Sequence, residues 1–318
     1  MIKKFRLVYI LSIEYIILNR IYSAYGSASP TVMAELRGFA STYVAHRNYC
    51  NYVKKELLSA ARRMQSNVTK FARVPSAGEV VLLDMCCGRG GDMFKWDALG
   101  IRRVYAFDSD YKSVQEAIRR YKDYRRKHRS PIIVNYHVQS ALSAEYIRDT
   151  ILRGKKVNIV SCMFALHYFS DLRTFLRNVS DNLVPGGLFV GVAPDSTYIK
   201  KLLDPDDPYK NDEVSVRWSD QRSYYFIINE STAVDRGEDY FSFRGESLEY
   251  LIDKEEMVCL AGEEGLDLVE MKNIADTASP YTASPYHSTQ SVGGTGAPPM
   301  SQLYFSFVFR RQNKISSE

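Results

Sequence analysis

The stretch that decides the fold of this chain is Val81-Leu-Leu-Asp84-Met-Cys-Cys-Gly88-Arg-Gly90-Gly-Asp92. An apolar run ends at an acidic residue, a glycine-rich turn follows, and a helix-like pattern begins at Met93. Because glycine has no Cβ, such a turn can adopt positive φ and let the backbone approach a nucleoside ligand closely. The stretch therefore predicts a strand, a ligand-binding turn and a helix of an open α/β sheet.

A second acidic residue, Asp108, ends the next apolar run. A carboxylate there suits the paired hydroxyls of a ribose, and its distance from Gly88 matches the spacing of about 20 residues that this geometry requires. A dinucleotide site is the rival interpretation, but here the glycines are bunched behind an acid that closes the strand. That order favours S-adenosylmethionine, whose amino-acid end carries an ammonium rather than a pyrophosphate. A purely structural turn is the remaining alternative.

Strand-like and helix-like segments alternate from Gly78 to Arg311, as in a doubly wound sheet. We predict strands near Val80–Leu83, Val104–Phe107, Ile132–Val134, Val157–Val160, Leu188–Val192, Leu266–Met271 and Leu303–Phe309. We predict helices near Met93–Leu99, Ser113–Arg126, Ala144–Leu152 and Leu172–Leu183, the last ended by the turn signal Val184-Pro-Gly-Gly187. The expected fold class is α/β: a Rossmann-like class I S-adenosylmethionine-dependent methyltransferase with a seven-stranded, mostly parallel sheet and helices on both faces.

The chain of 318 residues has room for one large α/β domain with appendages. We expect an N-terminal extension over residues 1–40 that is partly disordered, a methyltransferase domain over residues 41–311 and a tail over residues 312–318. Within the domain, polar stretches at about 204–220 and 275–299 predict mobile surface loops.

The apolar run Leu7–Leu18 has the outline of a signal sequence, but Glu14 and Arg20 interrupt that pattern. The run is also shorter than the roughly 20 apolar residues that span a bilayer. We therefore expect a cytosolic extension and no membrane anchor, with translocation as the weaker alternative.

Charge and cysteine content bear on the kind of partner and the cellular compartment of the chain. The net charge of +5 and the pI of about 8.8 favour a polyanionic partner only weakly. The five cysteines lack the spacing of a zinc site or of a disulfide framework, so we expect no metal and a reducing compartment, the nucleus or the cytosol. The predicted location is the nucleus, with the cytoplasm as the alternative for viral or cytoplasmic capping.

Several further motifs are spread along the chain. They are His46-Arg-Asn-Tyr-Cys-Asn-Tyr-Val-Lys54, Gly88-Arg-Gly-Gly-Asp92 with Lys95-Trp96, Ser161-Cys-Met-Phe-Ala-Leu-His-Tyr168, Pro185-Gly-Gly-Leu-Phe-Val-Gly-Val-Ala-Pro-Asp-Ser196, Leu248-Glu-Tyr-Leu251, and Tyr304 before Phe309-Arg310. Together they resemble the eukaryotic and viral messenger-RNA cap (guanine-N7) methyltransferases over nearly all of Ala45 to Arg311.

The resemblance implies a set of cofactor-binding residues. It implies that Lys54 meets the methionine carboxylate of S-adenosylmethionine, where an exposed helix lysine is the structural alternative. It also implies that Asp84 and Gly88 line the amino-acid end of the cofactor, and that Asp108 holds its ribose.

The adenine end departs from the family pattern. The resemblance assigns Gln139, Ser140 and Met163 to the cofactor as well. Ser140 stands where the family has an aspartate for the adenine amine, so a backbone carbonyl or Gln139 would make that contact. Met163 replaces a common glutamine, and Cys86 stands where the family usually has glycine.

For the substrate, the resemblance implies that Phe164, Tyr168 and Tyr304 form an aromatic slot for guanine. It implies that His167 and Glu249 address the edge of the base. Pro194 is also assigned to the substrate, and Tyr240 is a further candidate wall of the slot. The structural alternatives are core-facing aromatic residues, a structural histidine and a solvated helix carboxylate.

Arginine side chains suit the cap triphosphate because a guanidinium can make forked contacts with phosphate. The resemblance places Arg89 and Arg120 at that edge. The basic run Arg119–Arg129 either extends the path of the following RNA or is a solvated helix end.

The predicted reaction is methyl transfer from S-adenosylmethionine to nitrogen 7 of the guanine cap of RNA. That nitrogen carries a lone pair and no proton, so we expect neither a general base nor a metal, only positioning by His167, Tyr168 and Glu249. The alternatives are a methyltransferase acting on another RNA or a small molecule, and a catalytically silent RNA-binding subunit. Expected partners are capped RNA and a capping guanylyltransferase or triphosphatase, with the chain itself a monomer.

Overall fold

The computed structural model describes residues 46–65, 79–203, 214–228, 245–277 and 299–313. All of the expected N-terminal extension, most of the loop expected at 275–299, and Tyr240 lie outside these ranges. Within them, no helix is long and apolar enough to cross a bilayer. The run Leu7–Leu18 is outside the described residues, so its interpretation stays a prediction.

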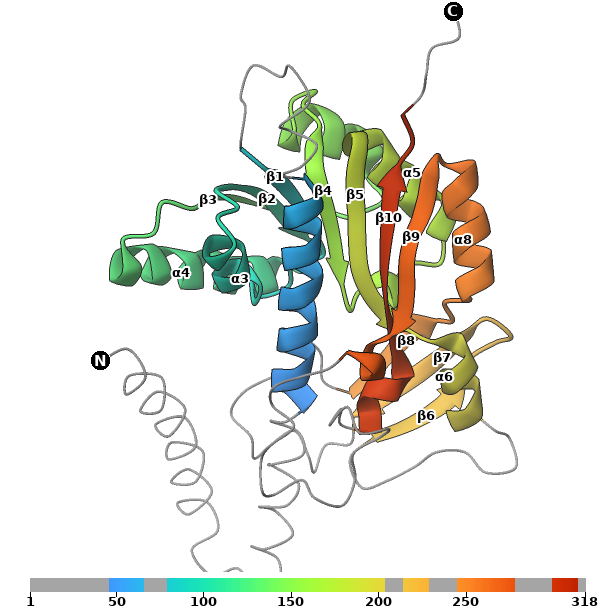
Figure 1. The fold of residues 1–318 in the computed structure, drawn as a ribbon. Coiled ribbons are helices and arrows are strands. Elements are labelled where there is room, and N and C mark those ends of the chain that lie inside the picture. The colour runs from blue at the N-terminus through green and yellow to red at the C-terminus, as the bar shows by residue number, and fades with distance from the viewer. Residues whose placement is uncertain (1–45, 66–78, 204–213, 229–244, 278–298, 314–318) are drawn as a thin grey trace, which may run out of the picture.

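A seven-stranded sheet forms the centre of the domain, with the strand order β3-β2-β1-β4-β5-β10-β9 (Figure 1). Its strands are β1 (Val81–Met85), β2 (Arg103–Asp108), β3 (Ile133–Val138), β4 (Val157–Met163), β5 (Leu183–Pro194), β9 (Leu266–Asn273) and β10 (Tyr304–Arg311). Strands β1 to β5 pair in parallel, whereas β10 is antiparallel to both β5 and β9. The predicted seven-stranded, mostly parallel sheet is confirmed.

One face of the sheet is covered by the helix at residues 46–65, by α3 (Met93–Ala98) and by α4 (Tyr111–His128), as Figure 1 shows. Buried side chains from these helices, such as Leu58 and Trp96, pack against Leu82 of β1 and its neighbours. Asp110 caps α4 by accepting from the backbone N–H groups of the first turn.

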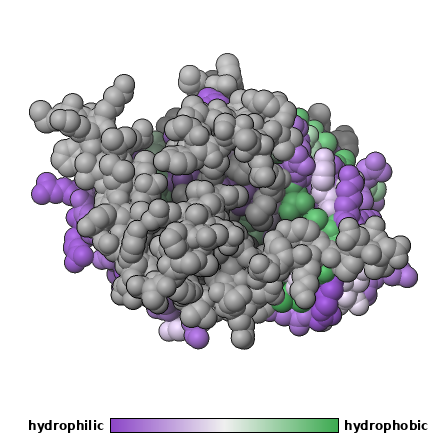
Figure 2. Space-filling model, turned by 90° about the horizontal axis from the view of Figure 1, so that it is seen from below, coloured by the Kyte–Doolittle hydropathy of each residue, from purple (hydrophilic) through white to green (hydrophobic). Residues whose placement is uncertain are grey.

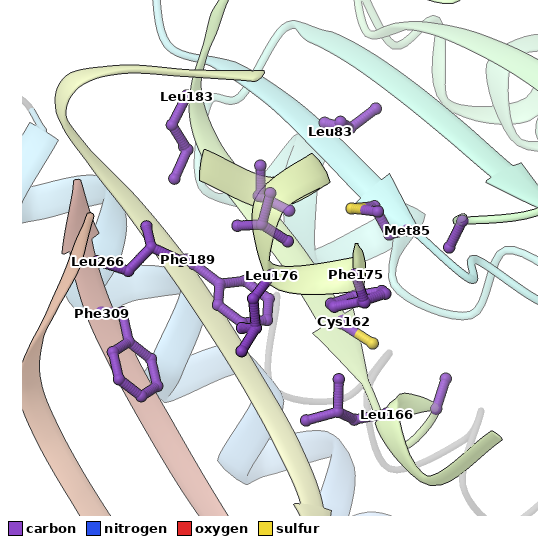
Figure 3. Close-up of a cluster of buried hydrophobic side chains, with 14 of the residues drawn as sticks. Leu83, Met85, Cys162, Leu166, Phe175, Leu176, Leu183, Phe189, Leu266 and Phe309 are labelled. Atoms are coloured by element: carbon purple, nitrogen blue, oxygen red, sulfur yellow. The ribbon is translucent and has the colours of Figure 1, made fainter. Parts of the chain in front are cut away.

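The opposite face is covered by α5 (Leu172–Asn182), α8 (Lys254–Glu263) and the short π-helix η1 (Tyr146–Ile151). Figure 3 shows Phe175 and Leu176 of α5 close to Phe189 of β5 in this second core. Because the inner strands are buried on both faces, they are almost entirely apolar, which is why the sequence predicts them well.

A second sheet, of strands β6 (Val214–Trp218), β7 (Ser223–Ile228) and β8 (Gly245–Tyr250), was not predicted. The prediction of a loop over residues 204–220 is therefore wrong for residues 214–218, which form β6. The small antiparallel sheet lies below the carboxyl ends of β4 and β5, beside α6 (Ser196–Leu202) in Figure 1. It has its own small core of Ile199, Leu203, Val216 and Tyr224.

Some boundaries differ from the prediction. The helix predicted over Ala144–Leu152 is formed, but its residues Tyr146–Ile151 are π-helical. The turn signal at 184–187 lies near the start of β5. There the pairing with β4 is interrupted: Val157 pairs with Leu183, but Ile159 pairs with Leu188. Residues flanking the last loop form two 3₁₀ turns, η3 (Ile274–Asp276) and η5 (Pro299–Leu303).

Candidate functional site

The glycine-rich turn after β1 lies next to Asp108 at the end of β2. Gly88 has a φ of +49°, and its backbone N–H donates to Asp108 Oδ2 at 2.8 Å. Gly90 has a φ of +69°, and a Cβ there would lie 3.0 Å from the Tyr136 hydroxyl. The turn predicted from the glycines is therefore formed, and Gly88 and Asp108 are brought into direct contact.

Asp84 is a buried carboxylate at the carboxyl end of β1. Its Oδ1 accepts a hydrogen bond of 2.6 Å from the Ser161 hydroxyl of β4. Burial, together with the nearby charge of Asp92, raises the pKa of Asp84 to about 7. A positively charged ligand group beside this carboxylate would reverse that unfavourable desolvation.

Asp92, which the sequence analysis left without a role, organises the cations at this end of the sheet. Its carboxylate accepts from Lys54 Nζ at 3.2 Å and from Lys95 Nζ at 2.7 Å. Burial alone would raise the pKa of Asp92, but the two ammonium groups hold it well below its usual range. Lys54 therefore reaches the site from the 46–65 helix, and its ammonium also lies 5.5 Å from the centre of the Phe164 ring.

The residues predicted at the adenine end follow the same sheet edge. The backbone N–H of Gln139 donates to the carbonyl of Asp108 at 2.9 Å, directly after β3. The side-chain oxygen of Gln139 accepts from Ser140 N–H and from the Ser143 hydroxyl, at 2.8 and 3.0 Å. Met163 is buried at the end of β4. These residues lie near the nucleoside end of the predicted site, and their contacts with a cofactor stay a prediction.

A cavity of about 220 Å³ opens beside this edge, between the carboxyl ends of β4 and β5 and the small sheet. Its walls include seven residues that the sequence assigns to cofactor or substrate: Lys54, Phe164, His167, Tyr168, Pro194, Glu249 and Tyr304. Figure 2 views this end of the molecule from below and shows hydrophobic and hydrophilic described residues adjoining one another. A larger hollow of about 520 Å³ between α8 and β9 contains none of the predicted residues.

Aromatic rings form one side of the cavity. Phe164 and Tyr304 meet edge to face with ring centres 5.1 Å apart, and His167 and Tyr168 lie 4.2 Å apart. Phe164 has a φ of +59°, a strained value for a residue with a Cβ, which directs this side chain from the sharp turn after β4. Tyr168 is 40% exposed, so a flat ligand can reach its ring.

A polar wall faces these rings. Glu249 is buried in β8, rather than lying on a solvated helix, and its Oε2 accepts from the Tyr224 hydroxyl at 2.7 Å. Its Oε1 lies 3.8 Å from His167 Nε2. Burial lowers the pKa of His167 despite Glu249, and its Nδ1 has no hydrogen-bond partner among the described residues. The Glu249 carboxylate and the His167 ring thus offer polar atoms on this wall, Glu249 Oε1 next to Nε2, with which a polar ligand edge can form hydrogen bonds.

The two arginines predicted at the triphosphate lie near the glycine turn but do not line the cavity. Arg120 Nη1 donates to the backbone carbonyl of Arg89 at 3.0 Å, so Arg120 supports the turn from α4. Their contact with phosphate stays a prediction. Tyr240 lies outside the described residues.

Comparison with known proteins identifies the family. Residues 20–288 match the mRNA (guanine-N(7))-methyltransferase domain. The chain belongs to this family. The seven-stranded sheet also matches the crystal structure of an S-adenosylmethionine-dependent methyltransferase from Clostridium acetobutylicum, with a TM-score of 0.50 and 16% identity over 80% of this chain and 91% of the other. This match supports the fold.

Curated relatives of this cap methyltransferase family match the chain over part of their length. The mRNA cap guanine-N(7) methyltransferase of Caenorhabditis elegans is 36% identical over 48% of this chain and 40% of its own length. That of Drosophila melanogaster is 29% identical, over 54% and 42%. That of Schizosaccharomyces pombe is 28% identical, over 64% and 58%. The chain therefore spans about half the length of the curated relatives it matches.

In this family member, sequence reasoning missed cavity residues that belong to unpredicted or distant elements. Tyr224, Val216 and Phe226 come from the small sheet, and Asn51 comes from the 46–65 helix. The aromatic run Ser223–Ile228 is a strand signal that could have revealed β7. The pairing that places Tyr224 opposite Glu249 has no sequence signal.

Proposed function

We propose that this chain transfers the methyl group of S-adenosylmethionine to nitrogen 7 of the guanine cap of RNA. The observation that carries the proposal is the shared cavity, in which Phe164, Tyr304 and the Glu249 carboxylate adjoin Lys54 at the edge of the glycine turn. Family membership supports the same reaction.

The residues of the glycine turn suit S-adenosylmethionine. The buried Asp84 carboxylate matches the ammonium of the methionine group, and Lys54 matches its carboxylate. Asp108 suits the ribose hydroxyls as an acceptor, and one of its oxygens also accepts from the backbone of the turn. When bound, the cofactor supplies an electrophilic methyl group on a sulfonium.

The cavity walls suit guanine. The rings of Phe164, Tyr168 and Tyr304 offer faces and edges to a flat base, and such contacts contribute about 1–3 kcal/mol per base. Glu249 Oε1 can accept from the N1 and N2 donors of guanine, because Tyr224 already occupies the other oxygen. This wall distinguishes guanine from adenine, which presents a different donor pattern on that edge.

The protein's part in the reaction is alignment. Nitrogen 7 of guanine has a free lone pair, so no side chain has to remove a proton. Holding donor and acceptor in line can contribute roughly 7–11 kcal/mol. His167 is kept neutral by burial, so it orients the base without adding a charge that would repel the sulfonium.

Product identification tests the proposal. Purified chain is incubated with methyl-labelled S-adenosylmethionine and RNA ending in GpppG, and the RNA is then digested and its methylated nucleoside identified. We expect label in 7-methylguanosine alone. Label in a ribose or in adenine would overturn the proposal, and so would the absence of transfer from a chain shown to bind the cofactor.

Finer points of the proposal concern partners and location. We propose capped RNA as the substrate, a capping guanylyltransferase or triphosphatase as a partner, a monomeric state and a nuclear location. Size-exclusion chromatography with light scattering would measure the mass of the chain alone and after mixing with a capping guanylyltransferase.

A further inference from the structure

Helix α4 concentrates the positive charge of the molecule. Its 18 residues include seven lysines and arginines against two acidic residues, a net charge of +5. The entire chain has the same net charge, so its remaining residues balance one another. The basic residues are Lys112, Arg119, Arg120, Lys122, Arg125, Arg126 and Lys127, with Arg129 following the helix.

Most of these cations form no ion pair with another residue that the structure describes. Arg119 pairs with Glu116 and Asp123, and Arg126 pairs with Asp123. Within the described part of the chain, no carboxylate lies at ion-pair distance from the exposed cations at 122, 125, 127 and 129. Cations in a last helical turn stabilise the helix dipole, but that effect does not explain a charge one turn earlier at Lys122.

A row of aromatic rings lies along the same helix. Phe94 of α3 is 45% exposed, and its ring centre is 4.8 Å from that of Tyr124 in an edge contact. Tyr124 in turn lies 4.6 Å from the ring of His128. Positions 120, 124 and 128 share one face of a helix because they are four residues apart. Arg125 and Lys127 flank Tyr124 on either side of this face and form one strip with its rings, whereas Lys122 lies on the other side of the helix.

This strip begins at the catalytic end of the sheet. Helix α3 starts directly after Asp92, which binds the cavity residue Lys54. Arg120 donates to the backbone of Arg89 in the glycine turn. From Arg120 to His128 the helix rises about 12 Å, away from the turn. Figure 1 shows α3 beside α4 on this flank of the molecule.

We propose that this strip, formed by Phe94, Tyr124, Arg125, Lys127 and His128, binds the single-stranded RNA that follows the cap. The inference rests on the proposed function, because the RNA is expected to run onto the strip from a cap held in the cavity. Lysine and arginine neutralise phosphates, and exposed rings stack on bases of any sequence, which together are the chemistry of single-strand binding.

The test compares a short and a long substrate. KM and kcat for methylation are measured with the dinucleotide GpppG and with a GpppG-ended single strand of about 20 nucleotides, longer than the roughly 4–16 that one binding module covers. We expect a lower KM for the long substrate. F94A should raise that KM by about 5- to 10-fold, with the KM for GpppG and kcat within about twofold of wild type. F94Y should restore the wild-type value.

Salt dependence separates charge from stacking. Substituting Arg125 or Lys127 by Gln should reduce the slope of log affinity against log salt by about 0.7 for each phosphate that the variant no longer neutralises, whereas F94A should leave the slope unchanged. Matched controls lie on the opposite flank: Y146A removes an aromatic residue of 40% exposure on η1, and K155Q removes an exposed lysine. Neither control should change the KM for either substrate.

Separate outcomes distinguish the inference from the proposed function. Methylation of GpppG with equal KM for the long substrate, unchanged by F94A, would overturn the strip alone. If neither substrate is methylated, the proposed function fails, and binding of uncapped RNA, measured by fluorescence anisotropy, still tests the strip. Binding that F94A and the charge substitutions leave unchanged, or equal effects of Y146A, would overturn it.

Discussion

Asp84, which we propose binds the ammonium of the cofactor, opposes folding when it is ionised. Its pKa is raised to about 7 in the folded protein by burial, from an ordinary value of 3.8. Well below pH 3.8 the carboxyl is protonated in both folded and unfolded states and has no effect. As the pH rises towards 7, the unfolded state ionises first, so stability falls by an amount on the order of 4 kcal/mol.

The D84N substitution should therefore separate stability from binding. We expect the free energy of unfolding to rise by a few kcal/mol at pH 8 but by only about 0.5 kcal/mol at pH 4, measured by urea denaturation. The affinity for S-adenosylmethionine of the wild type should rise about five- to tenfold from pH 6 to pH 7.5 as Asp84 ionises, and D84N should lose both the affinity and the rise. A destabilised D84N at pH 8 would contradict this assignment.

Cys86 sits in backbone geometry that favours glycine. Its φ of +75° costs about 1–2 kcal/mol for a residue with a Cβ. C86G should change the free energy of unfolding by less than about 1 kcal/mol, because relief of strain offsets the loss of packing and the added chain entropy. C86V should destabilise by about 2 kcal/mol or more, since a β-branched side chain tolerates positive φ poorly. Equal free energies of unfolding for C86G and C86V in urea titrations would contradict the inference that the backbone is strained at position 86.

At the scale of elements, the strands buried on both faces were predictable and the small sheet was not. Leu82 and Leu83 of β1 face opposite cores, so an apolar run marks the strand. In the small sheet, Arg217 and Tyr225 alternate with cavity-facing neighbours, and Arg217 also pairs with Glu246. Such mixed strands resemble loops until their pairing is known.

The same limit applied to the site. Motifs identified Phe164, His167 and Glu249, which the fold places around one cavity, because each belongs to a local pattern in the chain. Motifs did not assign Asp92 to the cations or Tyr224 to Glu249, because both contacts join segments that only the folded register brings together.

Tyr224 on β7 should act as a positioning residue for Glu249. Y224F removes the donor to Glu249 Oε2, so we expect the KM for GpppG to rise about tenfold, in line with the loss of a hydrogen bond to a charged group. The KM for S-adenosylmethionine should stay within about twofold. Preference for guanine over an inosine cap, which lacks the N2 amine, should weaken. Y225F, on the outer face of the same strand, is the matched control and should retain both properties.

At the scale of the whole molecule, the cavity lies between two sheets that differ in how many buried side chains support them. The main sheet is held by two extensive cores, whereas the described core beside the small sheet has four fully buried residues. Regions with few buried contacts open more often. We therefore expect backbone amides of β6 to β8 to exchange with solvent faster than those of β1, β4 and β5.

Each ligand should slow amide exchange in a different part of the protein. Hydrogen–deuterium exchange of the intact chain measures both effects. S-adenosylmethionine alone should slow exchange in the turn after β1, because Asp84 and Gly88 would contact it. GpppG should slow exchange in β7 and β8, because Glu249 and Tyr224 form the wall that we assign to guanine. E249A should abolish the second effect and keep the first. Protection of the small sheet by GpppG in E249A would show that the base binds elsewhere.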